Sequence, residues 1–201
     1  MQAEGFTVWF TGLPRSGKST VARMLVDALR QRGQHVELLN SARIRHEMNR
    51  SLGFSREDIE ISVRRLGYEC ALLNRNGLAA VVTAVSPYRH MRAELRKELP
   101  RFVEVYCRAP MEVLVARDTR ELFVGAQRGR IQHVAGVNAP YEEPLEPDVL
   151  LNTDVESPEA CIAKVTAKLE SLGLVQGIEQ PGYTVEEEEM IKQRLRDLGY
   201  L

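Results

Sequence analysis

Gly12-Leu13-Pro14-Arg15-Ser16-Gly17-Lys18-Ser19, followed by Thr20, is the stretch of this sequence that decides the fold. It matches the phosphate-binding pattern G-x-x-x-x-G-K-[ST], in which backbone amides surround the phosphates of a nucleotide. The apolar run 6–10 before it predicts a buried strand, and the apolar spacing over 21–29 predicts a helix. A strand, a glycine-containing loop and a helix in this order are the structural context of a nucleotide-triphosphate site.

The residue types in this loop suit the chemistry of phosphate binding. Gly12 and Gly17 allow the tight turn and the close approach of backbone N–H groups to phosphate oxygens. We expect Lys18 to reach the β- and γ-phosphates, and Ser19 to hold Mg²⁺ through its hydroxyl group. The alternative is a glycine turn before an ordinary helix, but the pattern arises by chance in such a chain only about once in 100.

The composition indicates one soluble globular domain. The chain has 201 residues, of which 44% are hydrophobic and 27% charged, enough for a sizeable core. A net charge of −1 gives no global field that would draw the protein to nucleic acid or a lipid surface. No apolar run is long enough to span a membrane, and a phosphate loop that starts at residue 12 leaves no room for a targeting peptide. Cys70, Cys107 and Cys161 form no C-x-x-C pair, which is typical of reduced thiols in a cytoplasmic protein.

Alternating strand and helix patterns predict the fold class. The predicted strands are five short apolar runs at 6–11, 35–39, 78–85, 102–107 and 148–152. The predicted helices between them lie at 18–31, 56–74, 89–98 and 111–117. This alternation predicts an α/β fold in three α/β/α layers, with a five-stranded parallel sheet and right-handed crossovers.

One edge of the predicted sheet is the expected place for a ligand. The carboxyl ends of parallel strands meet there, and ligands bind outside them in such folds. We therefore expect the phosphate loop, Asn40, Ser86 and Thr153, which each follow a strand, to line one cleft. Pro87 biases Ser86 away from helix, so that its side chain can point into the cleft; a plain strand-to-helix turn is the alternative.

Two basic segments have open interpretations. The segment 117–141 combines four arginines with glycines at hinge-like spacing, which favours a mobile lid over phosphates; a solvated surface helix and loop is the alternative. Arg64 and Arg65 lie in the middle of a predicted helix. Taken by themselves, these two residues are more typical of a solvated basic face than of a binding site.

The chain divides after residue 174. Residues 1–174 form the predicted P-loop domain, and 175–201 form a linker and a C-terminal helix. The linker is indicated by glycine and proline within 176–182, and the helix by a capping box at 184–187. Because a lone helix of this length is marginal in water, we expect it to dock on the domain or on a second subunit.

Over about residues 6–172 the chain resembles the adenylylsulfate (APS) kinase family. The matching motifs occur in the family's order: Gly12–Thr20, Arg45-His46, Leu52-Gly53-Phe54-Ser55, Asp58, Arg64-Arg65, Gly67, Ser86-Pro87-Tyr88-Arg89, 102–106, Arg117-Asp118, Gly136, Pro140-Tyr141-Glu142 and Leu151-Asn152-Thr153. So many ordered matches are hard to obtain by chance. The resemblance implies a P-loop kinase that moves the γ-phosphoryl group of MgATP to the 3′-hydroxyl of APS, giving PAPS and ADP for sulfate activation.

The resemblance also assigns roles to residues. It implies that Lys18 and Ser86 are catalytic, that Ser19 holds the metal, and that Phe54 stacks on the adenine of APS. The implied ATP-binding residues are Gly12, Pro14, Arg15, Ser16, Gly17, Lys18, Ser19, Thr20, Arg117 and Thr153. The implied acceptor-binding residues are Arg45, Phe54, Arg64, Arg65, Ser86, Pro87, Tyr88 and Arg120. A planar guanidinium suits both stacking and anion recognition.

The chain departs from the family pattern mainly on the acceptor side. Asn40 and Ala42 stand where the family has the two carboxylates of an Asp-Gly-Asp-Asn run, and Val134 stands where it has a phenylalanine that covers the APS adenine. The other departures are Arg43, Ile59, Ser62, Ala135 and Asn138. No carboxylate obviously replaces the lost pair, so the sequence identifies no general base.

Three functional interpretations stay open on the sequence. The first is an unusual APS kinase, because phosphoryl transfer through a loose transition state depends more on positioning than on a base. The second is the same chemistry on another small nucleotide-like or anionic alcohol, and the third is a nucleotide-binding regulatory module without turnover. The resemblance further implies a homodimer and an association with ATP sulfurylase.

Overall fold

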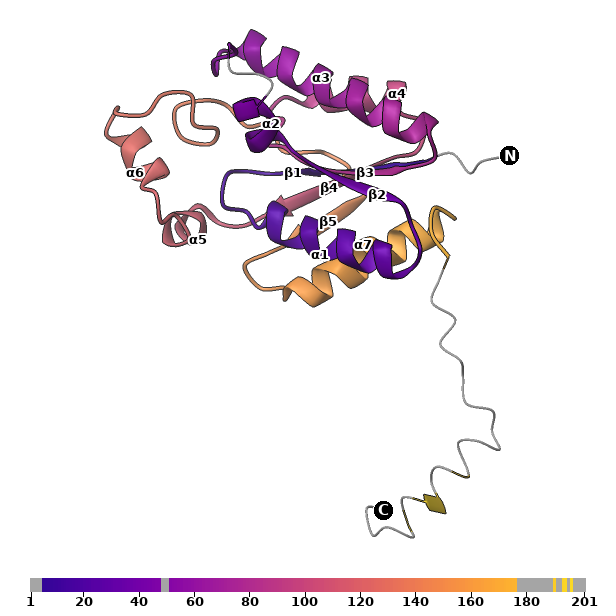
Figure 1. The fold of residues 1–201 in the computed structure, drawn as a ribbon. Coiled ribbons are helices and arrows are strands. Elements are labelled where there is room, and N and C mark those ends of the chain that lie inside the picture. Colours follow the sequence, from indigo (N-terminus) through magenta and orange to yellow (C-terminus); the bar gives the residue numbers. More distant parts are fainter. Residues whose placement is uncertain (1–4, 48–50, 177–189, 191–192, 195, 197–201) are drawn as a thin grey trace.

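The computed structural model describes residues 5–47 and 51–176, together with residues 190, 193, 194 and 196. Its central layer is a parallel sheet with the strand order β2-β3-β1-β4-β5 (Figure 1). The strands are β1 (Thr7–Thr11), β2 (Val36–Asn40), β3 (Ala79–Thr83), β4 (Phe102–Arg108) and β5 (Val149–Asn152). The five predicted strands are therefore confirmed, with bounds that differ from the predicted ones by two residues at most.

Helices cover both faces of this sheet (Figure 1). On one face lie α1 (Lys18–Gln31) and α7 (Pro158–Ser171); on the other lie α3 (Arg56–Arg75), α4 (Arg89–Glu98) and the short α2 (Ser41–Glu47). The bounds of α1 and α4 are the predicted ones, and α3 ends one residue later than predicted. The three-layer P-loop fold is thus confirmed.

The sequence analysis missed α2, α7 and α6 (Leu122–Gln127), and local signals could have found α7. Its N-terminal residue Pro158 follows Ser157, whose hydroxyl accepts a hydrogen bond from the backbone N–H of Ala160. A serine cap followed by proline at the first helical position is a strong start signal. By contrast, α2 is only seven residues long, so its apolar periodicity is too short to recognise.

Two apolar cores, one on each side of the sheet, account for the burial of the strands. Val8 and Phe10 face α1 and pack with Leu25 and Leu29. Trp9, between them, faces the opposite side and joins the core that α3 and α4 complete. Successive strand residues point to opposite faces, so a strand covered on both faces is buried at every position, as β1 and β3 are, and it is mainly apolar.

The packing of α3 against α4 depends on a glycine. A Cβ atom at Gly67 would lie 2.4 Å from Cδ2 of Leu95, a distance that real Cβ contacts do not reach. Gly67 therefore lets the two helices approach each other closely.

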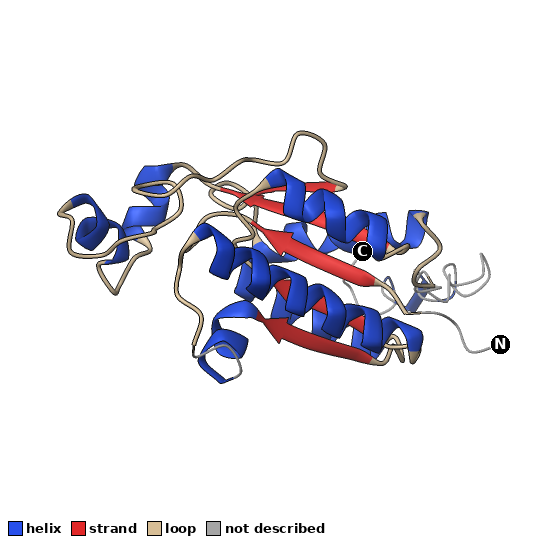
Figure 2. Ribbon diagram, turned by 90° about the horizontal axis from the view of Figure 1, so that it is seen from above, coloured by secondary structure: helices blue, strands red, loops and turns tan. Residues whose placement is uncertain are grey.

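The segment between β4 and β5 extends beyond the carboxyl edge of the sheet. It contains α5 (Met111–Ala116) and α6 (Leu122–Gln127), which project to one side of the layered body in both views (Figures 1 and 2). Leu114, Phe123, Ala126 and Val134 form a small core of their own here. The predicted lid segment 117–141 is thus a packed unit, and its mobility stays a prediction.

Two further expectations concern regions at the periphery. The predicted linker at 176–182 and the helix at 184–199 lie mostly outside the described residues, so the division after residue 174 stays a prediction. None of the helices in the described part of the chain is both long and apolar enough to cross a membrane.

Candidate active site

The loop between β1 and α1 has the backbone that its glycines predict. Gly12 has a φ of 141° and Gly17 a φ of 83°, both in the region that favours glycine. A Cβ atom at Gly12 would lie 2.3 Å from the carbonyl oxygen of Cys107 on β4, so no larger residue fits there. Gly17 directly precedes α1, so the free N–H groups and the positive dipole end of that helix face the loop.

Lys18 is buried within this loop. Its ammonium group donates hydrogen bonds to the carbonyl oxygens of Gly12 (2.9 Å) and Leu13 (2.7 Å), and to the hydroxyl of Ser16 (3.2 Å). Burial lowers the pKa of Lys18 from 10.5 to about 8, because the charged form loses hydration. The loop thus holds a cation that an incoming anion could readily recruit.

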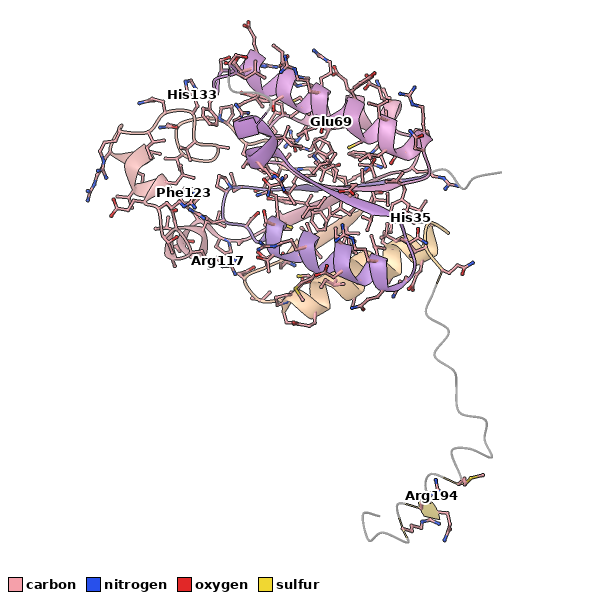
Figure 3. All side chains as sticks on the ribbon, in the orientation of Figure 1. His35, Glu69, Arg117, Phe123, His133 and Arg194 are labelled. Atoms are coloured by element: carbon pink, nitrogen blue, oxygen red, sulfur yellow. The ribbon has the colours of Figure 1, made fainter. Side chains whose placement is uncertain are left out.

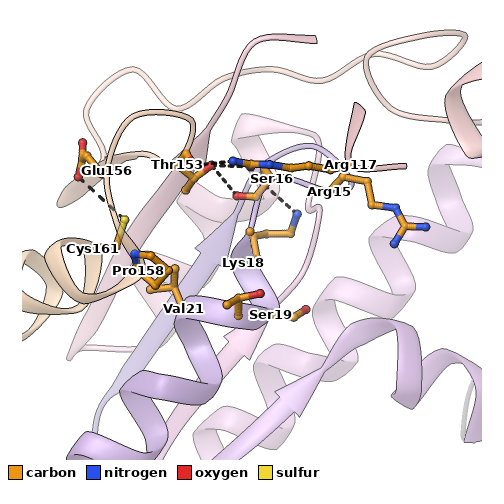
Figure 4. Close-up of a pocket in the computed structure, with 12 residues that line it drawn as sticks. Arg15, Ser16, Lys18, Ser19, Val21, Arg117, Thr153, Glu156, Pro158 and Cys161 are labelled. Carbon is orange, nitrogen blue, oxygen red and sulfur yellow. Dashed lines mark hydrogen bonds between the residues drawn. The ribbon is translucent and has the colours of Figure 1, made fainter. Parts of the chain in front are cut away.

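A cavity of about 480 Å³ lies beside the loop, over the start of α1 (Figure 4). We call it the donor pocket. Of the residues predicted to bind ATP, it is lined by Arg15, Ser16, Gly17, Lys18, Ser19, Thr20, Arg117 and Thr153. Gly12 is not part of this lining, and Pro14 lines a different cavity. The structure therefore brings the ends of β4–α5 and β5 to the phosphate loop, as the predicted site requires.

Arg117 and Thr153 form the wall of the donor pocket away from α1. The Arg117 guanidinium donates hydrogen bonds to the backbone carbonyl (2.6 Å) and the hydroxyl (3.3 Å) of Thr153. The Thr153 hydroxyl in turn donates to the carbonyl oxygen of Ser16 at 3.1 Å. This chain of contacts fixes a flat guanidinium at the mouth of the pocket, where it can stack on an aromatic base (Figure 4).

Besides Val21 of α1, the sequence analysis missed three lining residues, Glu156, Pro158 and Cys161. Glu156 accepts hydrogen bonds from Lys164 (2.8 Å) and from the backbone N–H of Asn152 (3.0 Å), so it shapes the loop after β5. The hydrogen bond from Lys164 is the main reason that the pKa of Glu156 is lowered. These residues come from the undetected α7 and the loop before it, which explains why they were missed.

A second cavity, of about 590 Å³, lies on the other side of the phosphate loop. We call it the acceptor cavity. Its walls come from α2, the start of α3, the turn after β3 and the segment 122–140. Of the predicted acceptor residues, it is lined by Arg45, Phe54, Ser86, Pro87 and Tyr88. Pro14 of the phosphate loop also lines it, so the two cavities meet at the loop.

The charge of the acceptor cavity is positive. Arg45 and Arg56 line it, and none of the described lining residues is an aspartate or a glutamate. The Arg45 guanidinium lies 4.5 Å from the centre of the Phe54 ring, and Phe54 is 55% exposed. An exposed aromatic ring beside a guanidinium suits a ligand that combines a flat base with an anionic group.

Arg56 and His133 were missed by the sequence analysis. Arg56 is the first residue of α3, and its guanidinium lies 4.8 Å from the centre of the Tyr88 ring. It precedes Ile59 by three residues, so both side chains fall on one face of the helix. The sequence signal that could have identified Arg56 was its three-residue spacing from Ile59, a position of the family's acceptor site. His133 comes from the lid segment (Figure 3) and lines the cavity.

Three predicted acceptor residues line neither cavity: Arg64, Arg65 and Arg120. Arg64 faces α4, where its guanidinium lies 3.9 Å from the carboxylate of Glu94. Arg65 is exposed on α3, and the backbone N–H of Arg120 binds Asp118 at the start of the lid segment. This geometry supports the solvated-face interpretation of Arg64 and Arg65 over direct contact with an acceptor.

Ser86 lies at the acceptor cavity, but its hydroxyl is already engaged. It accepts a hydrogen bond from the indole N–H of Trp9 (3.0 Å) and donates one to the hydroxyl of Thr11 (3.0 Å). Thr11 binds the carbonyl oxygen of Val85 at 2.8 Å and lies 3.1 Å from the hydroxyl of Tyr141. Only 3% of Ser86 is exposed. In this structure the Ser86 hydroxyl is thus engaged within the cavity wall, and its catalytic role stays a prediction.

The positions of the missing carboxylates have structural roles of their own. The side-chain oxygen of Asn40 accepts hydrogen bonds from the backbone N–H groups of Ala42 (3.0 Å) and Arg43 (3.2 Å), which caps the start of α2. Ala42 lines the acceptor cavity without offering a polar side chain. Val134 is buried in the lid core and also lines the cavity. No residue at these positions can accept a proton from an acceptor hydroxyl.

Asp118 connects the phosphate loop with the lid segment. Its carboxylate accepts hydrogen bonds from Arg15 (3.2 Å) and from the backbone N–H groups of Phe123 (2.9 Å) and Arg120 (3.3 Å). Burial works to raise the pKa of Asp118, but the two backbone hydrogen bonds and Arg15 outweigh it and lower the pKa. One ionised carboxylate thus joins the phosphate loop to the lid segment.

Comparisons with known proteins agree with this geometry. The family profile described as adenylylsulphate kinase matches residues 4–152. The adenylyl-sulfate kinase of Chloroflexus aurantiacus is 44% identical over 171 residues, which are 85% of this chain and 92% of that protein. "Probable bifunctional SAT/APS kinase 2" of Sorangium cellulosum is 45% identical, and this chain spans 29% of its length. The structure of the Mycobacterium tuberculosis APS kinase CysC with AMPPNP and APS has a TM-score of 0.79 and 36% identity, covering 83% of this chain and 98% of that one.

Proposed function

The chain belongs to the adenylylsulphate kinase family, and from this premise we propose that it moves the γ-phosphoryl group of ATP to the 3′-hydroxyl of adenylylsulfate. The products are PAPS and ADP. The observation that carries the proposal is the pair of cavities that meet at the phosphate loop. A phosphoryl group can pass between two substrates only if they meet end to end, and this arrangement gives each substrate its own side of the loop.

The donor pocket is the ATP side. The backbone N–H groups around Gly17 surround the phosphates, and Arg117 stacks on the adenine at the pocket mouth. Lys18 leaves the carbonyl oxygens of Gly12 and Leu13 and donates to the phosphates instead. Because the ammonium is poised beside the transferred group, it can stabilise the charge that develops in the transition state.

Magnesium is part of the proposal, with Ser19 as its protein ligand. The donor set fits, because Mg²⁺ in kinases takes one or two protein oxygens and completes its shell with phosphate oxygens and water. Within the described part of the chain, no group of three or more His, Cys, Asp or Glu side chains is placed to hold a metal by itself. When bound, the ion neutralises phosphate charge; the chain contributes the Ser19 hydroxyl at the edge of the pocket.

The acceptor cavity is the adenylylsulfate side. Phe54 stacks on the adenine of the acceptor, while Arg45 and Arg56 bind its phosphosulfate group. Arg56 takes the place that the sequence analysis gave to Arg64 and Arg65. Since none of the described lining residues is a carboxylate, the acceptor proton passes to an oxygen of the transferred phosphoryl group or to water, which a loose transition state permits.

Assembly and location complete the proposal. The chain self-associates, supported by an exposed apolar stripe of Ile61, Tyr68 and Leu72 along α3 and by the similarity to a structure named as a hexameric APS kinase. It also works next to ATP sulfurylase, supported by the relative with a bifunctional name. A cytoplasmic location follows from the need for ATP and from free thiols at its three cysteines.

Light scattering of wild type and Tyr68→Glu tests the self-association. A smaller mass is expected for the variant.

The decisive experiment is a turnover assay with purified protein, MgATP and adenylylsulfate. ADP release and PAPS formation are measured beside reactions with AMP, other nucleotides and sulfated alcohols as acceptors. Turnover with adenylylsulfate and none with AMP is the expected result, because the cavity is built to hold the additional anionic group. ATP binding without adenylylsulfate turnover would reject this acceptor, and activity with another panel member would identify the replacement.

A further inference from the structure

Arg92 is a buried arginine that none of the roles above includes. It lies on α4 and is 2% exposed, and each of its three guanidinium nitrogens donates a hydrogen bond. Its guanidinium donates to the carboxylate of Glu104 (2.6 Å) and to the backbone carbonyl oxygens of Ser86 (2.5 Å) and Glu142 (2.6 Å). Arginine is almost never buried unless it is paired, so this set of partners explains why it is retained there.

The three partners of Arg92 belong to three parts of the molecule. Ser86 begins the turn after β3, which forms one wall of the acceptor cavity. Glu142 directly follows the lid segment 117–141, which forms the opposite wall. Glu104 lies on β4 within the sheet. A single rigid guanidinium therefore joins both cavity walls to the sheet.

We propose that Arg92 is a positioning residue that fixes the two walls of the acceptor cavity, as one unit, in position and orientation relative to the sheet and the phosphate loop. The inference rests on the proposed function, because it treats that cavity as the acceptor site. Arg92 does not line the cavity and does not touch a substrate. It acts through the two backbone carbonyls to which it donates, and an error in their placement of about 1 Å costs about 100-fold in a reaction of this kind.

The conformation of Ser86 supports this role. Its φ is 38°, in the left-handed region that a serine rarely adopts. Arg92 holds the carbonyl group of this residue, while Trp9 and Thr11 hold its hydroxyl group. A strained backbone conformation persists only where surrounding contacts determine it from several sides, and it is often found at functional sites. Arg92 supplies one of these contacts, the hydrogen bond to the Ser86 carbonyl oxygen.

The lid end of this network has further contacts. The backbone N–H of Glu142 donates to the carbonyl oxygen of Pro87 (2.7 Å), and its carboxylate accepts from the backbone N–H of Arg89 (2.8 Å). These bonds join Glu142 to the turn after β3. Arg92 adds the attachment of both to β4 through Glu104. Its loss is therefore expected to leave the two walls in contact but free to shift together relative to the phosphate loop.

The chain offers a control in Arg96, one helical turn further along α4. It also approaches Glu104, at 3.6 Å, and binds Asp148 at 2.5 Å, but it is 40% exposed and reaches neither cavity wall. Arg96 keeps a positive charge near Glu104 when Arg92 is replaced, which favours a folded variant. Replacing Arg96 removes one partner of Glu104 but leaves the hydrogen bonds from Arg92 to both cavity walls in place.

The experiment compares Arg92→Lys, Arg92→Met and Arg96→Met with wild type. Lysine keeps the charge beside Glu104, but a single ammonium cannot replace a planar guanidinium that binds three separate oxygens. We expect Arg92→Lys to raise the KM for adenylylsulfate about tenfold and to change the KM for ATP less than about twofold, with Arg92→Met more severe. Arg96→Met is expected to match wild type in both constants.

A second readout does not depend on turnover. Trp9 is the only tryptophan of the chain, and its indole N–H binds the Ser86 hydroxyl. Its emission therefore reports the turn directly, and it is expected to differ from wild type in Arg92→Lys but not in Arg96→Met. Wild-type KM values and wild-type emission in Arg92→Lys would overturn the proposal, and so would equal increases of both KM values. Absence of adenylylsulfate turnover in wild type would reject the proposed function, while the emission test would still decide the role of Arg92.

Discussion

The donor pocket and the acceptor cavity meet at one loop, yet they are assembled differently. Most of the donor pocket comes from one continuous stretch, residues 15–21, completed by the ends of β4–α5 and β5. The acceptor cavity draws on α2, α3, the turn after β3 and the lid segment, which are far apart in the sequence. A site built from one local motif can be recognised from that motif, whereas a site built from several segments depends on how the fold places them.

The two sites also differ in the chemistry they offer. The donor pocket holds a buried lysine, a helix N-terminus and a hydroxyl, which together serve phosphate and Mg²⁺. The acceptor cavity offers an exposed ring and guanidinium groups but no carboxylate among its described lining residues. Chemistry should therefore depend on the donor side, and recognition should depend on the acceptor side.

Replacing Lys18 should have the largest effect. Lys18→Met keeps the length of the side chain but removes the ammonium that stabilises the transferred phosphoryl group. We expect kcat to fall about 10²–10³-fold, as for the loss of one transition-state donor. Steady-state ADP release measures this, with Lys168→Met on the surface of α7 as control. An unchanged kcat in a folded Lys18→Met protein would contradict the assignment of chemistry to the donor side.

Removing the Phe54 ring should affect the acceptor and spare ATP. Stacking of a base on an aromatic ring contributes about 1–3 kcal/mol, so Phe54→Ala should raise the KM for adenylylsulfate about 5–150-fold. Phe54 is 55% exposed, so the fold should tolerate the change. KM values for both substrates are measured at saturating concentrations of the other. Equal increases for ATP and adenylylsulfate would remove the distinction between the two cavities.

The pH dependence should reflect the donor side alone. The pKa of Lys18 in the free protein is lowered to about 8, so the charged form that binds phosphate is present below pH 8 and is lost as the pH rises. The value of kcat/KM for ATP should fall above pH 8, approaching about tenfold per pH unit. The profile is measured from pH 6 to 9.5. A profile that stays flat to pH 9.5 would show that another group carries the phosphate charge.

Arg56 should have a smaller effect than Phe54. Its guanidinium lies at the rim of the acceptor cavity, and its side chain is 63% exposed. We expect Arg56→Met to raise the KM for adenylylsulfate about fivefold, because exposed charge contacts contribute little more than 1 kcal/mol. Arg64→Met is the matched control, because Arg64 lies on the same helix beside α4 and does not line the cavity. A larger effect of Arg64→Met would restore the role that the sequence analysis gave to it.

Restoring a carboxylate should have the smallest effect. Ala42→Asp places an acidic side chain on the wall of the acceptor cavity, where none of the described lining residues is acidic. If positioning dominates a loose transition state, kcat should rise by no more than about fivefold. The measurement is kcat with saturating substrates near pH 7.5. An increase of 100-fold, which is typical of general-base catalysis, would show that the lost carboxylates limit this enzyme.

Much of the fold could be predicted because its signals are local. The strands are continuous apolar runs, and α1 and α4 have periodic apolar faces of ten residues or more. The missed α2 and α6 have seven and six residues, too few for a period to stand out. The described residues do not test the predicted C-terminal helix, so its docking stays a prediction.

The site was predictable to the extent that it is local. Lys18, Ser19 and their neighbours were identified from their order in the chain, because a phosphate loop and the start of its helix form a site with little outside help. Arg117 and Thr153, which the family resemblance gave, line the donor pocket. Arg64 and Arg65 of α3 line neither cavity, because sequence order does not show which face of a helix borders a cavity and which borders solvent.

The sequence by itself determined the succession of strands and helices along the chain, the phosphate loop and the chemistry of the donor pocket. Each of these depends on residues that are neighbours in the sequence. Tertiary structure decided which groups face the acceptor. The engagement of the Ser86 hydroxyl by Trp9, the position of Arg56 and the bond from Arg92 to Glu142 join residues that are dozens of positions apart. Such contacts depend on the packing of helices on the sheet, and no local pattern contains that information.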